Sequence, residues 1–271
     1  MNKKRHGLNI IHVFRVFLII CVITLVLYAA YKSLYRSQMN TYYAHPLIPN
    51  NLYQCYSNKA SIPHKVYKNK ALYAKQYSYE VWDYEQCSNY LRYHWGNQFY
   101  HIFNNLSVPA HKADFWRYCI LYDRGGIYMD IKMELIEPLQ KTVSRLKSAD
   151  FATILSIVDK TCMQGFIAVK QKHPILKACI HFIKTHYKKI NDGDYLSITR
   201  NMYTNICRHI NVSTLHPGLN KNVYLFKEVC TSNKNDCYDG LDRYQFCCYT
   251  LDGEPNSHEK VIKSRYADYP W

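Results

Sequence analysis

The sequence predicts an α/β domain that follows one N-terminal transmembrane helix. Short apolar segments with the spacing of strands are followed by segments with the spacing of helices, and this alternation indicates a sheet with helices on its faces. The composition is that of a globular protein, with 48% hydrophobic residues. A long apolar run near the N-terminus predicts the membrane helix. The 271 residues suffice for one such domain with its own core.

The apolar run extends from Ile10 to Ala30 and is interrupted by only three polar residues. Because basic residues precede it, the positive-inside bias predicts a cytosolic tail at residues 1–9, a signal-anchor helix at residues 10–31 and a lumenal remainder. A short span suits the thinner membranes of the early secretory pathway, so we expect a single-pass type II protein of the Golgi or endoplasmic reticulum. A cleaved signal peptide is the alternative, since Leu27-Tyr-Ala-Ala ends in small residues.

The rest of the chain is predicted to be a stem at residues 32–61 and a single folded domain at residues 62–271. The stem prediction rests on a mixture of Tyr, Asn, Ser and Pro, and the domain contains no internal repeat. Lys65-Val-Tyr67 is predicted to form the first strand of the domain. The alternating segment from Tyr77 to Asp83 is predicted to hold the second strand.

A helix and a strand are predicted to meet at a pair of glycines. Ala110 to Tyr122 has apolar residues at the spacing of a helix packed on one side. Gly125 suits the left-handed position after the last helical turn. Ile127-Tyr-Met129 then reads as a short buried strand that ends at Asp130. Ligands of α/β sheets bind beyond the carboxyl ends of strands, which is where this carboxylate is expected.

Two further features of the sequence predict a helix and disulfides in the later part of the domain. Pro174 is predicted to open a further helix. Eleven cysteines are present, none spaced as CxxC, and the group Cys230, Cys237, Cys247 and Cys248 predicts one or two disulfides. Reduced, buried cysteines are the alternative.

The chain is strongly basic. Its 35 Lys and Arg residues against 20 Asp and Glu give a formal net charge of +15, which favours anionic or phosphorylated partners. No zinc-finger, RNA-recognition or helix-turn-helix signature is present, so we expect no nucleic-acid partner. A polyanion-binding protein is an alternative that rests on the charge alone.

Three charged side chains are predicted to converge at the end of the Ile127-Tyr-Met129 strand. Asp114 and Arg117 are three residues apart on one helix and share a face, and Asp130 follows a flexible turn. Carboxylates accept hydrogen bonds from sugar hydroxyls, and a guanidinium offers several donors to a diphosphate. A surface salt bridge beside an ordinary turn would explain the same charges without a function.

The run Ala113-Asp-Phe-Trp-Arg-Tyr-Cys-Ile-Leu-Tyr-Asp-Arg-Gly-Gly-Ile-Tyr-Met-Asp130 resembles the signature of the DXD-containing glycosyltransferases. This family includes initiation-specific α-1,6-mannosyltransferases, inositol-phosphoceramide mannosyltransferases, galactosyltransferases of the α-1,4 type and glucosylating bacterial toxins. Further similar segments extend the resemblance over most of residues 62–271: Ile62 to Val66, Tyr79 to Asp83, Gly165 to Val169 with His173-Pro174, and Ile262 to Tyr266. The last of these resembles tails of viral and lower-eukaryotic members.

The resemblance implies a GT-A fold and a retaining hexosyltransferase. Its donor would be a GDP- or UDP-linked mannose, galactose or glucose, and its acceptor a glycan or glycolipid. By matched position, Asp114 and Arg117 are expected to hold the sugar and its phosphates, Tyr128 to line the nucleotide pocket, and Asp130 to contact the donor and a metal. The expected substrate-binding set is completed by Asp83, Gly125 and Gly126.

The chain departs from the family pattern at Lys132, where the family has the second acid that binds Mn²⁺ or Mg²⁺. A buried cation there would repel a divalent ion. Lys132 itself could stabilise the leaving diphosphate, joining Asp130 and Arg117 as a catalytic residue without a metal. Alternatively, Glu134, which has the strand parity of Asp130, could join it as a metal ligand if the chain stays extended. A third interpretation is a domain that binds a nucleotide-sugar or carbohydrate but has lost catalysis.

Overall fold

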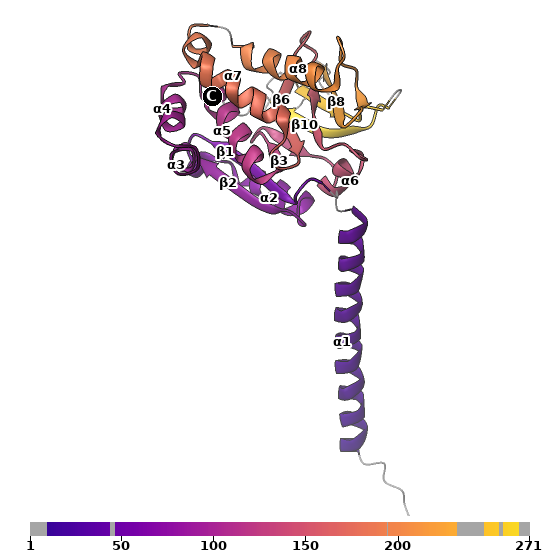
Figure 1. The fold of residues 1–271 in the computed structure, drawn as a ribbon. Helices are drawn as coiled ribbons and strands as arrows, with labels where there is room; N and C mark the ends of the chain where they lie inside the picture. Colours follow the sequence, from indigo (N-terminus) through magenta and orange to yellow (C-terminus); the bar gives the residue numbers. More distant parts are fainter. Residues whose placement is uncertain (1–9, 44–46, 194, 232–246, 255–256, 266–271) are drawn as a thin grey trace, which may run out of the picture. The chain divides into compact units, whose positions relative to one another are not determined.

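The computed structural model describes residues 10–43, 47–193, 195–231, 247–254 and 257–265. The chain forms two units, Met1–Ala44 and His45–Trp271. The described part of the first unit is one continuous helix, α1 (Ile10–Tyr43), drawn in indigo in Figure 1. Its segment Phe14–Ser33 has 20 residues and a mean hydropathy of 2.3, so it is long and apolar enough to cross a membrane. A signal sequence meets the same criteria, so the helix shows the capacity for a span only. The predicted tail at residues 1–9 lies outside the described residues.

The second unit is a mixed α/β domain in which helices and strands alternate along most of the chain. Its elements in order are β1 (Asn51–Tyr56), the 3₁₀ helix η1 (Lys59–Ser61), α2 (His64–Tyr73), β2 (Ser78–Asp83), α3 (Tyr84–Trp95), α4 (Asn97–Asn105), α5 (Pro109–Arg124), β3 (Gly126–Met129), β4 (Met133–Leu135), α6 (Leu139–Ser144), β5 (Phe151–Leu155), β6 (Cys162–Val169), α7 (Pro174–Asn191), α8 (Ser197–Ile210), β7 (Gly218–Asn220), β8 (Val223–Thr231), β9 (Cys247–Leu251) and β10 (Lys260–Arg265).

All described strands belong to one sheet with the order β2-β1-β3-β6-β5-β8-β9-β10-β4, and β7 pairs with β8. The pairs β1–β2, β1–β3 and β5–β8 are parallel, whereas the other pairs are antiparallel. The mixed sheet agrees with the predicted α/β class. Because β1, β2 and β3 run parallel, their carboxyl ends share one edge, and Asp130 follows β3 at that edge.

The sheet curls, and the chain itself shows why. β3 is third in the strand order and β4 is last, yet only residues 130–132 join them. Four Cα steps cover at most roughly 14 Å, so the last strand of the order must approach β3. The acidic motif therefore lies in the short connection that links the middle of the sheet to its last strand.

The two faces of the sheet carry two hydrophobic clusters, because successive side chains of a strand point to opposite faces. Tyr128 belongs to the cluster that includes side chains of α3, α4, α5, α7 and α8. Its neighbours Ile127 and Met129 belong to the cluster that includes side chains of α2 and α6. Figure 1 shows this arrangement, with α5 and α7 on one side of the strands and α2 on the other. Tyr128 is thereby directed towards α5, which carries Asp114 and Arg117.

Two expectations about the start of the domain are wrong. The predicted strand at Lys65-Val-Tyr67 lies within helix α2, whose buried side chains Val66 and Lys70 are four residues apart, the spacing of a helix. The first strand is instead β1, which has four buried residues in its centre and lies between β2 and β3. β1 falls inside the predicted stem at residues 32–61, so the folded domain begins before Ile62.

The other predicted elements are confirmed. The strand ending at Asp83 is β2, the helix over Ala110 to Tyr122 is α5, and the helix opened by Pro174 is α7. Strand β3 delivers Asp130 as expected, and α5 ends at Gly125 with φ of 63°. One disulfide, Cys230–Cys248, joins β8 to β9, and Cys237 lies outside the described residues.

Candidate active site

Arg117 connects the two predicted carboxylates. Its Nη2 lies 3.2 Å from Asp114 Oδ1, and its Nη1 lies 3.3 Å from Asp130 Oδ1. Nη1 also donates to the carbonyl oxygen of Gln164 at 2.5 Å, and the guanidinium lies 4.1 Å from the centre of the Tyr128 ring. Burial opposes the positive charge, but Tyr128, Asp130 and Asp114 outweigh it and raise the pKa of Arg117. The guanidinium of Arg117 is therefore permanently charged, and these contacts fix its orientation.

Asp130 is held from several directions. Its Oδ1 accepts a hydrogen bond of 3.0 Å from the Tyr128 hydroxyl, and its Oδ2 lies 3.8 Å from Lys132 Nζ. The backbone is fixed as well, since Asp130 N donates to Gly165 O at 2.7 Å and Gln54 Nε2 donates to Asp130 O at 3.0 Å. Burial opposes ionisation, but Arg117, Lys132 and the Tyr128 hydroxyl overcome it and lower the pKa of Asp130. This carboxylate is ionised at neutral pH.

For Asp114 and Lys132, unlike Asp130, burial outweighs the neighbouring charges and sets the direction of the pKa shift. It raises the pKa of Asp114 despite the neighbouring Arg117. It also lowers the pKa of Lys132, against the attraction of Asp130. Glu228 of β8 adds a further negative charge that favours the protonated form of Lys132. The lysine is thus a buried cation, 8% exposed, among carboxylates.

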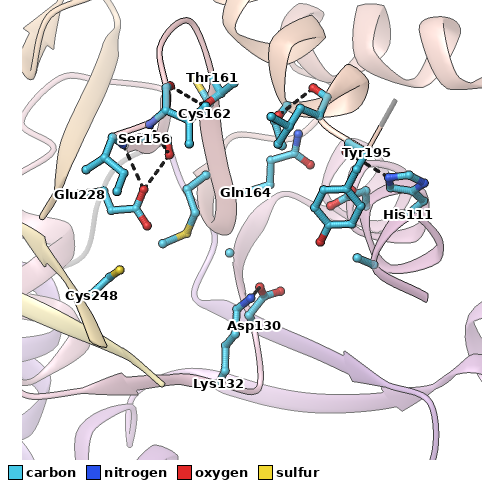
Figure 2. A pocket seen from close by; sticks show the side chains of 18 of the residues that line it. His111, Asp130, Lys132, Ser156, Thr161, Cys162, Gln164, Tyr195, Glu228 and Cys248 are labelled. Atoms are coloured by element: carbon cyan, nitrogen blue, oxygen red, sulfur yellow. Dashed lines mark hydrogen bonds and ion pairs between the residues drawn. The ribbon is translucent and has the colours of Figure 1, made fainter. Parts of the chain in front are cut away.

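Two cavities meet at the motif. The larger, of about 360 Å³, lies between α5, the end of β3, the β5–β6 connection and β8, and includes Asp114 and Arg117 in its walls. The smaller, of about 240 Å³, lies at the end of β1 and is lined by Tyr56, Tyr128 and other residues. Asp130 and Lys132 line both cavities. Figure 2 shows these two side chains close together on the floor of the larger cavity.

The structure does not bring every predicted site residue to these cavities. The Asp83 side chain accepts a hydrogen bond of 2.9 Å from Gln86 N and caps helix α3. Glu134 lies in β4 beyond a turn at residues 131–132, so the extended chain needed to align it with Asp130 does not exist. Neither residue lines the two cavities.

The glycine pair has a packing role. A Cβ atom at Gly125 would lie 2.8 Å from Gln171 N, and one at Gly126 would lie 2.7 Å from Asn51 O. Both glycines have positive φ, of 63° and 108°. They allow α5 and β3 to approach neighbouring backbone rather than lining either cavity.

The residues of the larger cavity that were missed from the sequence include His111, Gln164, Tyr195 and Glu228. The side-chain oxygen and nitrogen of Gln164 and the Nδ1 atom of His111 are buried and have no hydrogen-bond partner among the described residues. His111 precedes Asp114 by three residues on α5, so helical spacing could have identified it. The other three come from separate segments and carry no local signal.

The residues present do not fit a divalent metal of the DXD type. Lys132 occupies the position of the second acid, and the oxygens of Asp130 already face Arg117 and Lys132. Within the described part of the chain, one group of three metal-ligand side chains lies close together: Glu228, Cys230 and Cys248. The two sulfurs are joined to each other, so they are not metal ligands in this state.

Sequence comparisons relate the chain to glycosyltransferases. Residues 47–149 match the model of the glycosyltransferase sugar-binding region containing the DXD motif. An uncharacterized glycosyltransferase of Acanthamoeba polyphaga mimivirus is 26% identical over 224 residues, which cover 73% of this chain and 83% of that protein.

Two solved structures also resemble the chain, each at 14% identity. They are the PaToxG glycosyltransferase, with a TM-score of 0.45 over 68% of this chain and 80% of that one, and a transferase mutant, with a TM-score of 0.32 over 61% and 87%. Both scores are too low to bear on the activity of this chain. The region that brings Asp114, Arg117 and Asp130 to one cavity thus matches the sugar-binding region of the DXD-containing glycosyltransferases.

Proposed function

We propose that this protein transfers a hexose from a GDP- or UDP-sugar to an acceptor hydroxyl, with retention of configuration and without a divalent metal at the motif. The observation that carries the proposal is that Asp130 and Lys132 line both cavities. A nucleotide-sugar has two bulky ends joined by a diphosphate. Two cavities that meet at a charged junction match that shape.

The smaller cavity suits the nucleoside. It lies at the carboxyl end of β1, where Tyr56 and Tyr84 offer aromatic rings and hydroxyls to a base and ribose. The larger cavity then receives the sugar. Its hydroxyls would donate to the carboxylates of Asp114 and Asp130 and pair with the carboxamide of Gln164, whose buried polar atoms have no partner among the described residues.

The diphosphate would lie at the junction, beside the cations. Lys132 supplies an ammonium where related enzymes place a metal ligand, and Arg117 supplies a guanidinium held by Asp114 and Asp130. Fixed cations in a buried site stabilise charge as it develops on a leaving group, because they need little reorganisation. We expect Lys132 and Arg117 to act together, since both cations lie beside Asp130.

In the proposed reaction the bond between the anomeric carbon and the β-phosphate oxygen breaks, and the acceptor oxygen forms a bond to that carbon from the same face. The proton of the acceptor hydroxyl passes to the departing phosphate oxygen, so no enzyme base or nucleophile is required. The residues of the chain orient the donor, exclude water and stabilise the diphosphate. The nucleoside diphosphate leaves as the second product.

We also propose that α1 anchors the protein in a Golgi or endoplasmic reticulum membrane, with the domain in the lumen. The hydropathy of Phe14–Ser33 and the basic residues before it support this arrangement. The Cys230–Cys248 disulfide supports an oxidising compartment. Attachment of a glycosylation tag to each side of α1 tests the topology, because only a lumenal tag is modified.

The experiment that tests the activity is nucleotide release by the full chain in detergent. A panel of GDP- and UDP-linked hexoses is supplied, each with Mn²⁺ and with EDTA, in the presence of mixed glycan and glycolipid acceptors. We expect release from one donor that persists in EDTA. Release that EDTA abolishes would contradict the metal-independent mechanism. Binding of a donor without any release would indicate a protein that binds a nucleotide-sugar but does not transfer it.

A further inference from the structure

Tyr195 is an exposed aromatic side chain at the mouth of the larger cavity. It lies in the connection between α7 and α8, lines the cavity, and has 52% of its surface exposed. Figure 2 shows the ring beside His111, on the side of the cavity opposite Ser156 and Glu228. An aromatic ring that served only to complete the core would be covered by neighbouring residues.

His111 holds Tyr195 in this position. The two rings are 5.4 Å apart with an angle of 34° between their planes, and His111 Nε2 lies 3.2 Å from the carbonyl oxygen of Tyr195. His111 is almost fully buried on α5, three residues before Asp114. The exposed ring is thus attached to the helix that carries the donor-binding charges.

The hydroxyl of Tyr195 is directed towards Asp130. In Figure 2 it points towards the part of the cavity that contains Asp130. Burial raises the pKa of Tyr195, and the negative charges of Asp114 and Asp130 raise it further. A molecule resting on this ring would therefore lie next to the proposed position of the donor sugar.

The opposite side of the mouth is apolar as well. Ile157 and Val158, in the connection between β5 and β6, line the same cavity and are 58% and 44% exposed. Their connection is fixed by Glu228, whose Oε2 accepts hydrogen bonds from Ser156 Oγ at 2.7 Å and Ile157 N at 3.2 Å. The mouth has apolar sides and a polar, charged floor.

We propose that Tyr195 is the platform of an acceptor subsite, and that the acceptor is a glycan ending in a hexopyranose. A pyranose ring presents C–H groups on its faces, which pack on an aromatic ring, and hydroxyls on its edge, which reach polar groups. The mouth of the cavity offers that combination. This inference rests on the proposed function, because an acceptor subsite requires a donor beside it.

The test compares transfer with hydrolysis in the full-length protein, using the donor identified from the panel. Methyl α- and β-hexopyranosides serve as acceptor probes, and mass spectrometry measures the disaccharide product against free sugar. We expect Tyr195→Ala to lower the ratio of transfer to hydrolysis about tenfold and to raise KM for the probe. The reason is that loss of a stacked aromatic ring weakens acceptor binding by about that factor. Tyr195→Phe should keep the ratio within about twofold.

Tyr93→Ala is the matched control, since Tyr93 is an 85% exposed tyrosine of α3 that lines neither cavity. A wild-type ratio in Tyr195→Ala would overturn the inference, as would hydrolysis by the wild-type protein without transfer to any probe. If Tyr195→Ala lowers the melting temperature, Tyr195→Leu replaces it, because leucine keeps an apolar side chain without a flat ring. The ratio of transfer to hydrolysis should then fall in Tyr195→Leu, and a wild-type ratio would overturn the inference. Absence of both hydrolysis and transfer in the wild-type protein would contradict the proposed function instead.

Discussion

Each charged residue of the site depends on its neighbours for its ionisation state. Burial raises the pKa of Asp130, but Arg117, Lys132 and a tyrosine hydroxyl outweigh this effect and lower the pKa. Asp114 has a raised pKa instead, because burial and the negative charge of Asp130 outweigh the neighbouring cations. Two carboxylates on one guanidinium therefore have different proton affinities, and a single substitution changes the charge of more than one group.

Asp130→Asn tests the carboxylate without changing the shape of the side chain. We expect kcat to fall by about 10² to 10³, because the amide pairs less well with Lys132 and with sugar hydroxyls. Glu134→Gln is the matched control, since Glu134 lies outside both cavities, and it should retain nearly wild-type kcat. A comparable loss in both variants would show that Glu134 belongs to the site.

Lys132→Asp recreates the acidic pair that related enzymes use for a metal. We expect this variant to lose activity in EDTA and to recover part of it with Mn²⁺, whereas the wild-type protein keeps its activity in EDTA. Isothermal titration of Mn²⁺ should detect binding by the variant only. Equal Mn²⁺ binding by the wild-type protein would show that Lys132 does not replace the metal.

The residues that could be predicted from the sequence are those of the continuous run from Asp114 to Lys132. Helical spacing and the end of a strand are local properties, so their convergence could be inferred. Gln164, Tyr195 and Glu228 reach the same cavity from β6, a connection and β8, and no local pattern links them. Glu134 was misplaced because strand parity assumes an extended chain, whereas the chain turns at residues 131–132.

At the scale of elements, the glycine pair between α5 and β3 sets how closely the helix approaches the sheet. We expect Gly126→Ala to destabilise the fold by about 2 kcal/mol, because the added Cβ would lie 2.7 Å from Asn51 O and φ is 108°. Differential scanning calorimetry measures the change. Gly96→Ala is the control: φ is 86° there, but a Cβ would meet nothing within 4 Å. Equal effects would assign the cost to backbone strain rather than to packing.

Helix α7 begins with a histidine cap that requires the neutral ring. His173 Nδ1 accepts from Ile175 N at 3.2 Å, and its Nε2 lies 3.2 Å from Asp150 Oδ1. Burial lowers the pKa of His173 to about 4. As pH falls, the unfolded chain takes up this proton first, near pH 6.5, so stability present above that pH is lost progressively towards pH 4.

The resulting loss in the free energy of unfolding should reach up to ~3 kcal/mol, measured by urea denaturation between pH 7 and 4. His173→Asn keeps a capping side chain but does not titrate, so it should show a shallower pH dependence. Carboxylates other than Asp150, which contacts His173, contribute equally to both proteins and cancel in the comparison. Identical slopes would show that His173 is not protonated on unfolding in this range.

Helix α5 could be predicted because its apolar spacing is a property of one segment. The error at Lys65-Val-Tyr67 arose because three residues are too few to distinguish the two-residue periodicity of a strand from the periodicity of a helix. Pro63 is at the N-cap of α2 and makes no side-chain capping hydrogen bond, so no capping signal marked the start of the helix. β1 was missed because its polar neighbours resemble a stem, and its burial comes from strands and helices that are distant in the sequence.

At the scale of the whole molecule, the curled sheet is closed by pairings between distant parts of the chain. Ile262 of β10 pairs with Leu135 of β4, and Cys230 lies opposite Cys248 in the β8–β9 pair. Such pairings leave no periodic signal in the sequence, so the α/β class could be predicted but the order of strands could not.

The Cys230–Cys248 disulfide closes a segment with a sequence separation of 18. Replacing both cysteines by alanine should lower the free energy of unfolding by ~3 kcal/mol, since a cross-link of this length restricts the unfolded chain. Denaturation with and without dithiothreitol measures the effect. The wild-type protein should respond to the reductant, whereas the double variant should not. Cys207→Ala, which removes a free cysteine of α8, should behave like the wild-type protein.

The position of β4 has a consequence for the order in which the protein becomes active during synthesis. Within the described sheet, β4 pairs only with β10, and β4 directly follows the segment that carries Asp130 and Lys132. A ribosome makes that segment early and β10 late. Helix α2 holds β4 through hydrogen bonds from Lys70 Nζ to Met133 O and between Asn69 and Leu135. Until β10 emerges, β4 still lacks its pairing with β10, so the nascent domain should bind donor less well even when its central strands have formed. Among the described strands, the one made last thus completes the sheet beside the site, and full activity should appear only when the sheet has closed.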